Sequence, residues 1–174
     1  NNILDFSKLE SGQMTVNSYP FYLVNAVKSM ALRAEKRAEE KGLQWFFELG
    51  EGLPAYVEGD QEKMEQILWN IMDNALTYTK EGSVTFRVTT QSEESDIHNV
   101  YFIIEDTGDG IQDNTSNRMF LAFHHDSVRD DTKTLGLGLS TAERLSRLLG
   151  GNISVKSEYG KGTLVRIVLP FKVL

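Results

Sequence analysis

Apolar residues recur every three or four positions in two long stretches of the chain, as the buried face of a helix requires. The first stretch opens at Pro20 and Phe21 and ends at Gly42. The second follows Asp60, which suits the N-cap of a helix, and ends before Gly82. The predicted buried faces are Val27, Met30, Ala31, Ala34 and Ala38 in the first helix, and Met64, Ile67, Leu68, Ile71 and Ala75 in the second.

Other segments alternate apolar and polar residues or are almost continuously apolar, and both patterns indicate strands. The predicted strands cover residues 43–49, 84–89, 100–105, 153–156 and 163–170. Further helices are predicted over 1–12 and 136–149. Residues 106–135, which directly precede the second of these helices, show little periodicity. Because short turns join several of the strands, we expect an α+β fold. It would be a two-layer α/β sandwich with a mixed, mostly antiparallel sheet packed on helices.

Composition narrows the possible functions. The chain has 174 residues, 40% of them hydrophobic and 25% charged, which fits one ordinary globular domain. The formal net charge is −7 and there is no basic run, so we expect no nucleic-acid partner. The absence of cysteine excludes disulfides, thiolate zinc sites and cysteine nucleophiles.

One face of the second predicted helix carries amides. Gln66, Asn70 and Asn74 are spaced four residues apart, with Asp73 and Thr77 close to the same face. Amide oxygens can ligate Mg²⁺, and amide NH₂ groups can donate to phosphate oxygens. On spacing alone, a solvated helix face is an equally open interpretation.

Two glycine-containing segments add candidate chemistry. In DTGDGI (106–111), a carboxylate placed just past a strand could accept from the amine of adenine, and glycines allow a flat ligand to approach closely. In LGLGLST (135–141), free amides at the start of the predicted helix could bind anions. The alternatives are a plain glycine turn and tight packing of a helix start. Neither segment matches the phosphate-binding P-loop or the dinucleotide fingerprint.

In combination and in order, these motifs resemble the catalytic ATP-binding domain of sensor histidine kinases. That family lies in the superfamily that includes the ATPase domains of gyrase, Hsp90 and MutL. NIMDNALTYT (70–79) resembles the N box, and EDTGDGI (105–111) resembles the first glycine box. MFLAFHH (119–125) resembles the F box, LGLGLST the second glycine box, and GKGT (160–163) the last one. The opening ILDFSKLESG is similar to the end of the family's dimerisation helix.

The resemblance implies a Bergerat-type ATP-binding fold with ATP and Mg²⁺ as ligands. Asn74 would be the principal Mg²⁺ ligand, with Asn70 assisting, and these two would be the catalytic residues. Asp106 would accept from the adenine amino group. The remaining nucleotide site would comprise Gly108 and Gly110 at the adenine, Phe120 and Phe123 at the base of a lid, Lys133, Gly136, Leu137 and Gly138 around the phosphates, and Thr163.

The resemblance also implies an organisation and partners. Residues 1–13 would end the dimerisation and phosphoacceptor helix, and residues 14–174 would form the catalytic domain. The parent would be a homodimer that phosphorylates a histidine of its own dimerisation domain and then a response-regulator receiver domain. None of His98, His124 and His125 has the family's acceptor context, so the acceptor is expected before Asn1 and the fragment alone would be inactive. We expect a cytoplasmic domain of a parent anchored in the inner membrane.

The chain departs from the family pattern in two of these motifs. Thr77 stands where the family usually has a lysine, so a cation that would neutralise phosphate is missing. Lys133 and Thr134 stand where the second glycine box usually has glycines. The candidates for a substitute cation are Lys80, Arg118, Arg129 and Lys133.

These departures keep other functions open. One alternative is a nucleotide-binding or degenerate regulatory module without kinase turnover. Another is an ATPase of the chaperone or topoisomerase type. Against that second alternative, Asn70 occupies the position where such ATPases carry a general-base glutamate.

Overall fold

The structure is a computed structural model that describes residues 15–91, 95–108, 130–158 and 160–174, with the backbone alone over 130–137. The elements in chain order are β1 (Tyr19–Tyr22), α2 (Leu23–Lys41), β2 (Gln44–Leu49), β3 (Tyr56–Gly59), α3 (Gln61–Tyr78), β4 (Ser83–Thr90), β5 (Ile97–Asp106), α5 (Asp130–Leu148), β6 (Asn152–Glu158) and β7 (Gly162–Val173). No helix in these described ranges is long and apolar enough to cross a membrane.

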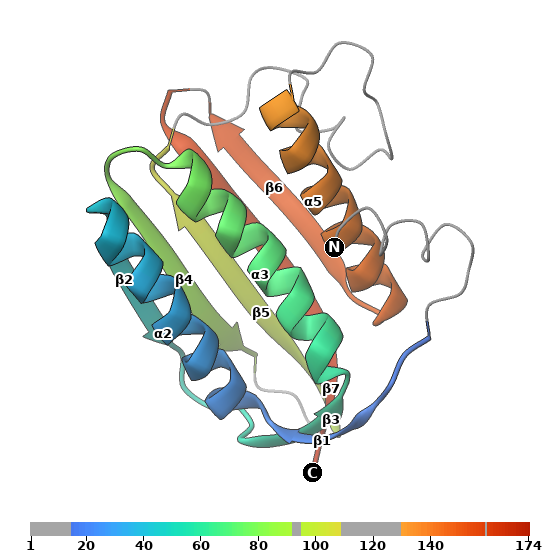
Figure 1. Ribbon diagram of the computed structural model, residues 1–174. Helices are drawn as coiled ribbons and strands as arrows, with labels where there is room; N and C mark the ends of the chain where they lie inside the picture. The colour runs from blue at the N-terminus through green and yellow to red at the C-terminus, as the bar shows by residue number, and fades with distance from the viewer. Residues whose placement is uncertain (1–14, 92–94, 109–129, 159) are drawn as a thin grey trace.

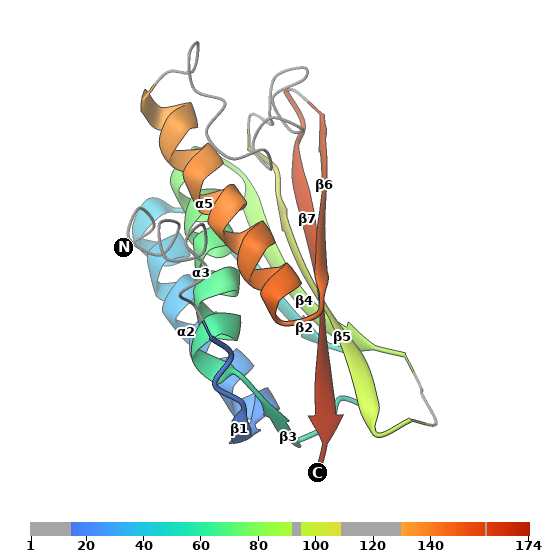
Figure 2. The same cartoon turned by 90° about the vertical axis from the view of Figure 1, so that its right-hand side faces the viewer.

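The elements form two layers. α2, α3 and α5 lie side by side on one face of a seven-stranded sheet (Figures 1 and 2). The strand order is β1-β3-β7-β5-β4-β2, and β6 pairs with β7. Every pairing is antiparallel except that between β2 and β4. The expected two-layer sandwich with a mixed, mostly antiparallel sheet is therefore confirmed.

The start of the first helix was predicted wrongly. Pro20 and Phe21 belong to strand β1, which pairs antiparallel with β3, and α2 begins at Leu23. Proline disfavours helical backbone in the residue before it and has no N–H to donate, which suits a strand at the edge of a sheet. The predicted end is confirmed, because Gly42 caps α2 with φ 74°.

Helix α3 starts where the sequence predicts. The carboxylate of Asp60 accepts the backbone N–H groups of Lys63 at 3.1 Å and Asn17 at 2.8 Å. The Lys63 ammonium lies 3.0 Å from the same carboxylate. Burial acts to raise the pKa of Asp60, but the hydrogen bonds from Asn17 and Lys63 outweigh it and hold that pKa below its ordinary value of 3.8. Asp60 therefore fixes both the helix start and the chain that precedes β1.

The core lies between the helix layer and the sheet. α3 contributes its apolar stripe, and strands β4, β5 and β7 contribute the side chains of alternate residues. The largest fully buried side chains are Phe86, Phe102, Leu23, Met64, Ile67, Leu68, Met72, Leu76, Ile104, Leu145, Ile167 and Leu169. Each such side chain stabilises the fold by about 1.5–3 kcal/mol when it is buried. The buried stripe consequently fixes which face of α3 points away from the sheet.

Replacing Asp60 by Ala should destabilise the fold by about 2 kcal/mol or more, because the helix loses its cap and the buried Lys63 ammonium loses its partner. Urea unfolding at pH 7 measures this change. The same substitution at Glu158, which pairs with Lys161 on the surface, should change stability by less than about 1 kcal/mol. Since the pKa of Asp60 is lowered, its contribution should persist above about pH 4 and fade as the pH falls further. Equal effects of the two substitutions would contradict this role.

Candidate functional site

Asn70 and Asn74 lie on the face of α3 that the buried stripe leaves free. Both residues are half-buried, and the amide nitrogen of each is buried without a hydrogen-bond partner among the described residues. A buried donor left unpaired costs about 1–3 kcal/mol. Free amide donors suit phosphate oxygens, and the amide oxygens of the same side chains are ligands that Mg²⁺ accepts. This face therefore has the donor set that a magnesium–phosphate group requires.

Asp106 ends strand β5. Its carboxylate accepts the Gly108 N–H at 2.9 Å and also the N–H of Thr163, its partner residue on β7. Burial raises the pKa of Asp106 to about 6, although the hydrogen bonds from Gly108 and Thr163 oppose the rise; the nearby Glu105 charge adds to it. The carboxylate is thus ionised at neutral pH at an energetic cost, as is common for a group with a binding role.

Three segments converge at this carboxylate. A Cβ added at Gly108 would lie 3.1 Å from the Asp106 carboxylate, the Thr79 hydroxyl and the Tyr78 carbonyl oxygen. A Cβ added at Gly162 would lie 2.1 Å from the Asp106 carbonyl oxygen. A side chain at Gly108 would press against the end of α3, and a side chain at Gly162 would push β7 away from the end of β5. Both glycines are therefore needed for the close approach.

Thr79 belongs to this cluster, although sequence reasoning assigned it no role. Its side chain is fully buried, and its hydroxyl has no partner among the described residues. It immediately follows α3, so it lies about one and a half turns, roughly 7.5 Å along the axis, beyond Asn74. The cluster can thus present a carboxylate and a hydroxyl to one ligand whose phosphates extend toward Asn74 and Asn70.

The adjacent side of α3 contacts α2. Asp73 pairs with Arg37, so Asp73 is not an open carboxylate, and Arg37 also donates to the Thr77 hydroxyl at 3.3 Å. Lys41 donates to the carbonyl oxygens of Leu76, Thr77 at 3.1 Å and Thr79 at 3.2 Å. A cation at these positions caps the C-terminus of α3 and suits the negative end of its dipole. Sequence reasoning missed both basic residues.

The second glycine segment differs from the prediction. α5 begins at Asp130 rather than at Gly136, so the four amides that a helix leaves free at its start belong to 130–133. The predicted helix start at Gly136 was therefore wrong, while the role of residues 136–138 at the phosphates stays a prediction. Gly138 is buried inside α5. Lys133, Gly136 and Leu137 are described only by their backbone within α5.

Several predicted positions lie outside the described residues. These are Gly110, Phe120 and Phe123 of the nucleotide site, the cations Arg118 and Arg129, and the dimerisation-helix segment 1–13. Among the predicted site residues with described side chains, Asp106, Gly108 and Thr163 come together at one end of α3. Asn74 and Asn70 lie along the same helix, about one and a half and two and a half turns from this end.

The chain matches a family of ATP-binding domains. The matching family is described as histidine kinase-, DNA gyrase B-, and HSP90-like ATPase, and the match covers residues 59–173. The chain belongs to this family. This ATPase domain is 34% identical over 172 residues to hybrid signal transduction histidine kinase B of Dictyostelium discoideum. The alignment covers 98% of the domain and 9% of that relative.

Further relatives support the histidine kinase resemblance. The ATPase domain is 31% identical over 172 residues to the aerobic respiration control sensor protein ArcB of Escherichia coli (strain K12), covering 97% of the domain and 22% of ArcB. It therefore spans less than a quarter of the length of both relatives. The resemblance to histidine kinase catalytic domains, expected from the ordered motifs, is confirmed.

Solved structures agree with the fold. Full-length ShkA, whose structure was solved in complex with AMPPNP, superposes on the whole ATPase domain with a TM-score of 0.81 and 29% identity, over 35% of its own chain. The catalytic domain of histidine kinase ThkA superposes with a TM-score of 0.68 over 90% of the ATPase domain and 97% of its own chain. At 21% identity, that second likeness concerns the fold alone.

The raised pKa of Asp106 predicts how the ligand-free stability depends on pH. Because the folded-state pKa of about 6 exceeds the ordinary 3.8, the group's contribution to stability is full below pH 4 and is lost as the pH rises through 6. We expect Asp106→Asn to gain stability relative to the wild type by roughly 3 kcal/mol between pH 4 and pH 7.5. Urea unfolding of both chains across this range tests it. If the free energy of unfolding varied with pH in the same way in both chains, ionisation of the Asp106 carboxylate would not destabilise the fold.

Proposed function

We propose that this ATPase domain transfers the γ-phosphate of ATP to a histidine of its own dimerisation domain, as the catalytic part of a sensor histidine kinase. The observation that carries the proposal is the pair of unpartnered buried amides, Asn70 and Asn74, on the helix that ends at the Asp106 cluster. One part of this site suits an adenine and the other suits charged oxygens. The proposal gives ATP as the phosphate donor and Mg²⁺ as the metal.

The residues divide the work between recognition and positioning. Asp106 in its ionised form accepts from the adenine amino group, while Thr79 offers a hydroxyl beside it, next to Gly108. Asn74 and Asn70 would hold Mg²⁺ and orient the phosphates. When bound, Mg²⁺ would supply charge neutralisation for the transferring phosphoryl group. Because phosphoryl transfer depends mainly on position and charge neutralisation, the task of the protein is chiefly to bind and orient the nucleotide.

The proposal extends to the parent protein. We assign residues 1–13 to the end of the dimerisation helix and 14–174 to the catalytic domain. The partners would be the dimerisation domain of a homodimeric parent and a receiver domain whose aspartate accepts the phosphate. A cytoplasmic position beneath an inner-membrane anchor stays a prediction; fractionation of cells that express the parent would test it.

The alternative is a module that binds nucleotide without turnover. The observation that favours it is Thr77, in place of the family's lysine. Addition of a dimerisation domain carrying its histidine, with γ-labelled ATP, separates the two. Label on the histidine supports the kinase. Nucleotide binding without label under these conditions supports the module.

Nucleotide titration by calorimetry is the primary test. The wild type should bind ATP and ADP, with Mg²⁺ strengthening ATP binding. Asp106→Asn should weaken both by at least about tenfold, because it removes the charge that strengthens the bond from the amine and replaces one acceptor oxygen by a donor. Asp96→Asn is the matched control, since Asp96 is an exposed residue at the opposite end of β5. Failure of the wild type to bind at millimolar nucleotide would refute the proposal.

Asn74→Ala should separate binding from stability. The substitution removes an unpaired buried amide and introduces a better helix former, so the free domain should be stabilised by about 1 kcal/mol. The Mg²⁺-dependent part of ATP binding should nevertheless disappear. Thermal melting and titration with and without Mg²⁺ measure the two effects. Asn25→Ala, on the exposed face of α2, should leave binding unchanged. Intact Mg²⁺ dependence in Asn74→Ala would exclude this residue as a ligand.

A further inference from the structure

The contact between α2 and α3 places a positive charge beside Thr77, where the N-box-like segment lacks the family's lysine. Thr77 occupies the position of the family's lysine, three residues after Asn74. Residues three apart on a helix are neighbours on its surface. One Nη atom of Arg37 lies 3.3 Å from the Thr77 hydroxyl, and the other pairs with Asp73. A guanidinium from α2 therefore stands beside the position where the family places an ammonium from α3.

We propose that Arg37 supplies the phosphate-binding cation of this domain in place of the lysine. The proposal rests on the proposed function, since it assumes that nucleotide binds along α3. In this arrangement, Arg37 donates to phosphate oxygens of the bound nucleotide while Asp73 and Thr77 orient its guanidinium. Arg37 was not among the candidates that the sequence offered.

The chemistry of arginine allows this double use. A guanidinium has five N–H donors in a rigid plane, and two acceptors on α3 leave others for a ligand. The side chains of Arg37 and Asp73 remain 33% and 46% exposed. A pair this exposed contributes little to stability, so it can rearrange around a phosphate at low cost.

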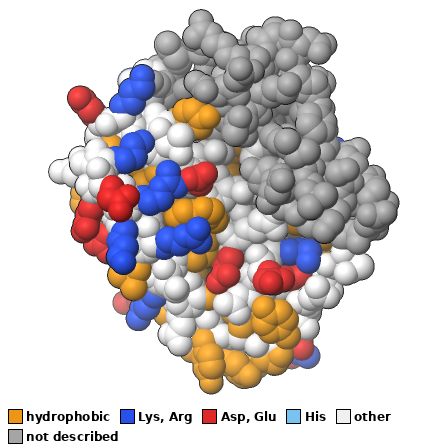
Figure 3. Space-filling view, in the orientation of Figure 1, with side chains coloured by type: hydrophobic (Ala, Val, Ile, Leu, Met, Phe, Trp, Pro, Cys, Tyr) orange, Lys and Arg blue, Asp and Glu red, His pale blue; other side chains and the backbone are white. Residues whose placement is uncertain are grey.

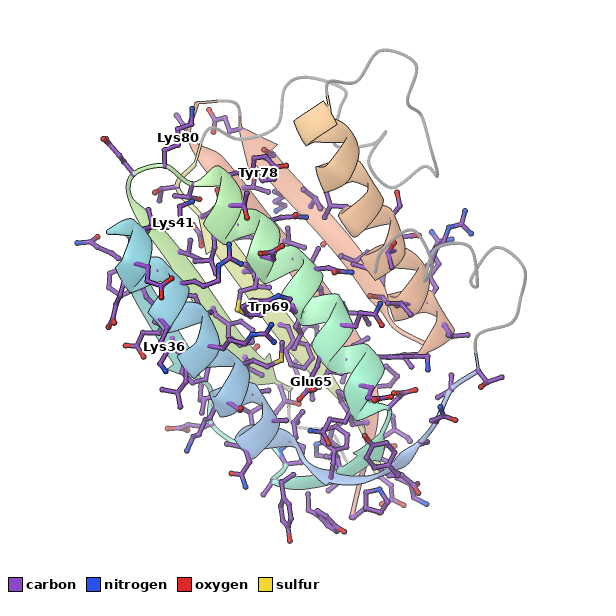
Figure 4. The ribbon with its side chains drawn as sticks, viewed as in Figure 1. Lys36, Lys41, Glu65, Trp69, Tyr78 and Lys80 are labelled. Carbon is purple, nitrogen blue, oxygen red and sulfur yellow. The ribbon has the colours of Figure 1, made fainter. Side chains whose placement is uncertain are left out.

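The other described cations on this side are less suited. Lys41 already donates to three carbonyl oxygens, which uses all the donors of an ammonium. The guanidinium carbon of Arg33 lies 4.0 Å from the centroid of the Trp69 ring. Trp69 is five residues before Asn74 on α3, so Arg33 lies farther from Asn74 than Arg37 does. Lys80 is exposed beyond the end of α3. Figure 4 shows Lys41 and Trp69 between α2 and α3, and Figure 3 shows Lys and Arg side chains gathered over these helices.

Arg37 could also assist phosphate binding indirectly, by offsetting the negative charge of Asp73. The Asp73 carboxylate is adjacent to Asn74 on α3 and would otherwise repel a polyphosphate. Simple shielding of Asp73 would leave the phosphates without any contact to Arg37. The two roles predict different results when Asp73 is also removed.

The experiment titrates ATP and AMP, with Mg²⁺, into the wild type and four variants. Arg37→Gln should weaken ATP binding by about tenfold, the fold-change expected of one charge-assisted hydrogen bond, and leave AMP binding nearly unchanged. Arg33→Gln, one turn away on α2, is the matched control and should bind ATP like the wild type. Thermal melting of each chain checks that the fold is retained.

Two double variants then separate contact from shielding. Adding Thr77→Lys to Arg37→Gln should restore ATP affinity, because it returns the cation to the family's position. Adding Asp73→Asn should not restore it. Wild-type affinity in Arg37→Gln, or full recovery with Asp73→Asn, would overturn the inference while leaving the proposed function intact. Failure of the wild type to bind ATP would overturn both.

Discussion

The burial of one face of α3 is the constraint on which the rest of the site depends. Met64, Ile67, Leu68 and Met72 are fully buried toward the sheet, so the helix cannot rotate about its axis without exposing them. This fixes the direction of Asn70 and Asn74. The core therefore positions the polar face, and the site needs no separate scaffold for its amides.

The same helix carries groups that the fold leaves unsatisfied. The amides of Asn70 and Asn74 and the hydroxyl of Thr79 are buried without partners among the described residues, and the Asp106 carboxylate is ionised despite its burial. Each lowers the stability of the free domain. Groups of this kind persist where a ligand satisfies them. Their position along one line from β5 to the middle of α3 matches an elongated polar ligand better than a compact one.

Periodicity predicted the parts of the fold that local physics determines. The alternation in β4 and the Asp60 cap of α3 appear as expected, because one buried face per element is a strong local pattern. Strand β3 has four residues, which is too short to show periodicity. The strand at Pro20 depends on a partner 38 residues away, since Pro20 pairs with Glu58. Such pairings are invisible in a local window.

The site was predictable where its chemistry lies within one motif. Asp106 follows an apolar strand directly, and Asn70 and Asn74 share one helix face. The sequence pattern was therefore enough to identify them as candidate site residues. Thr79 offered no such signal, because a threonine after a helix is ordinary. The start of α5 was misplaced because glycines at 136 and 138 predicted a boundary, yet the helix continues through them.

The contact between α2 and α3 explains how the N-box-like segment can lack its lysine while a positive charge remains beside it. Lys41 and Arg37 both reach from α2 to the last turns of α3, where the helix dipole attracts cations. A lysine at 77 would stand beside the Arg37 guanidinium and repel it. Thr77 instead accepts a hydrogen bond from Arg37. A motif read along one helix is therefore incomplete wherever a neighbouring helix supplies the charge, and the absence of a lysine in the N-box-like segment is weak grounds for calling the site degenerate.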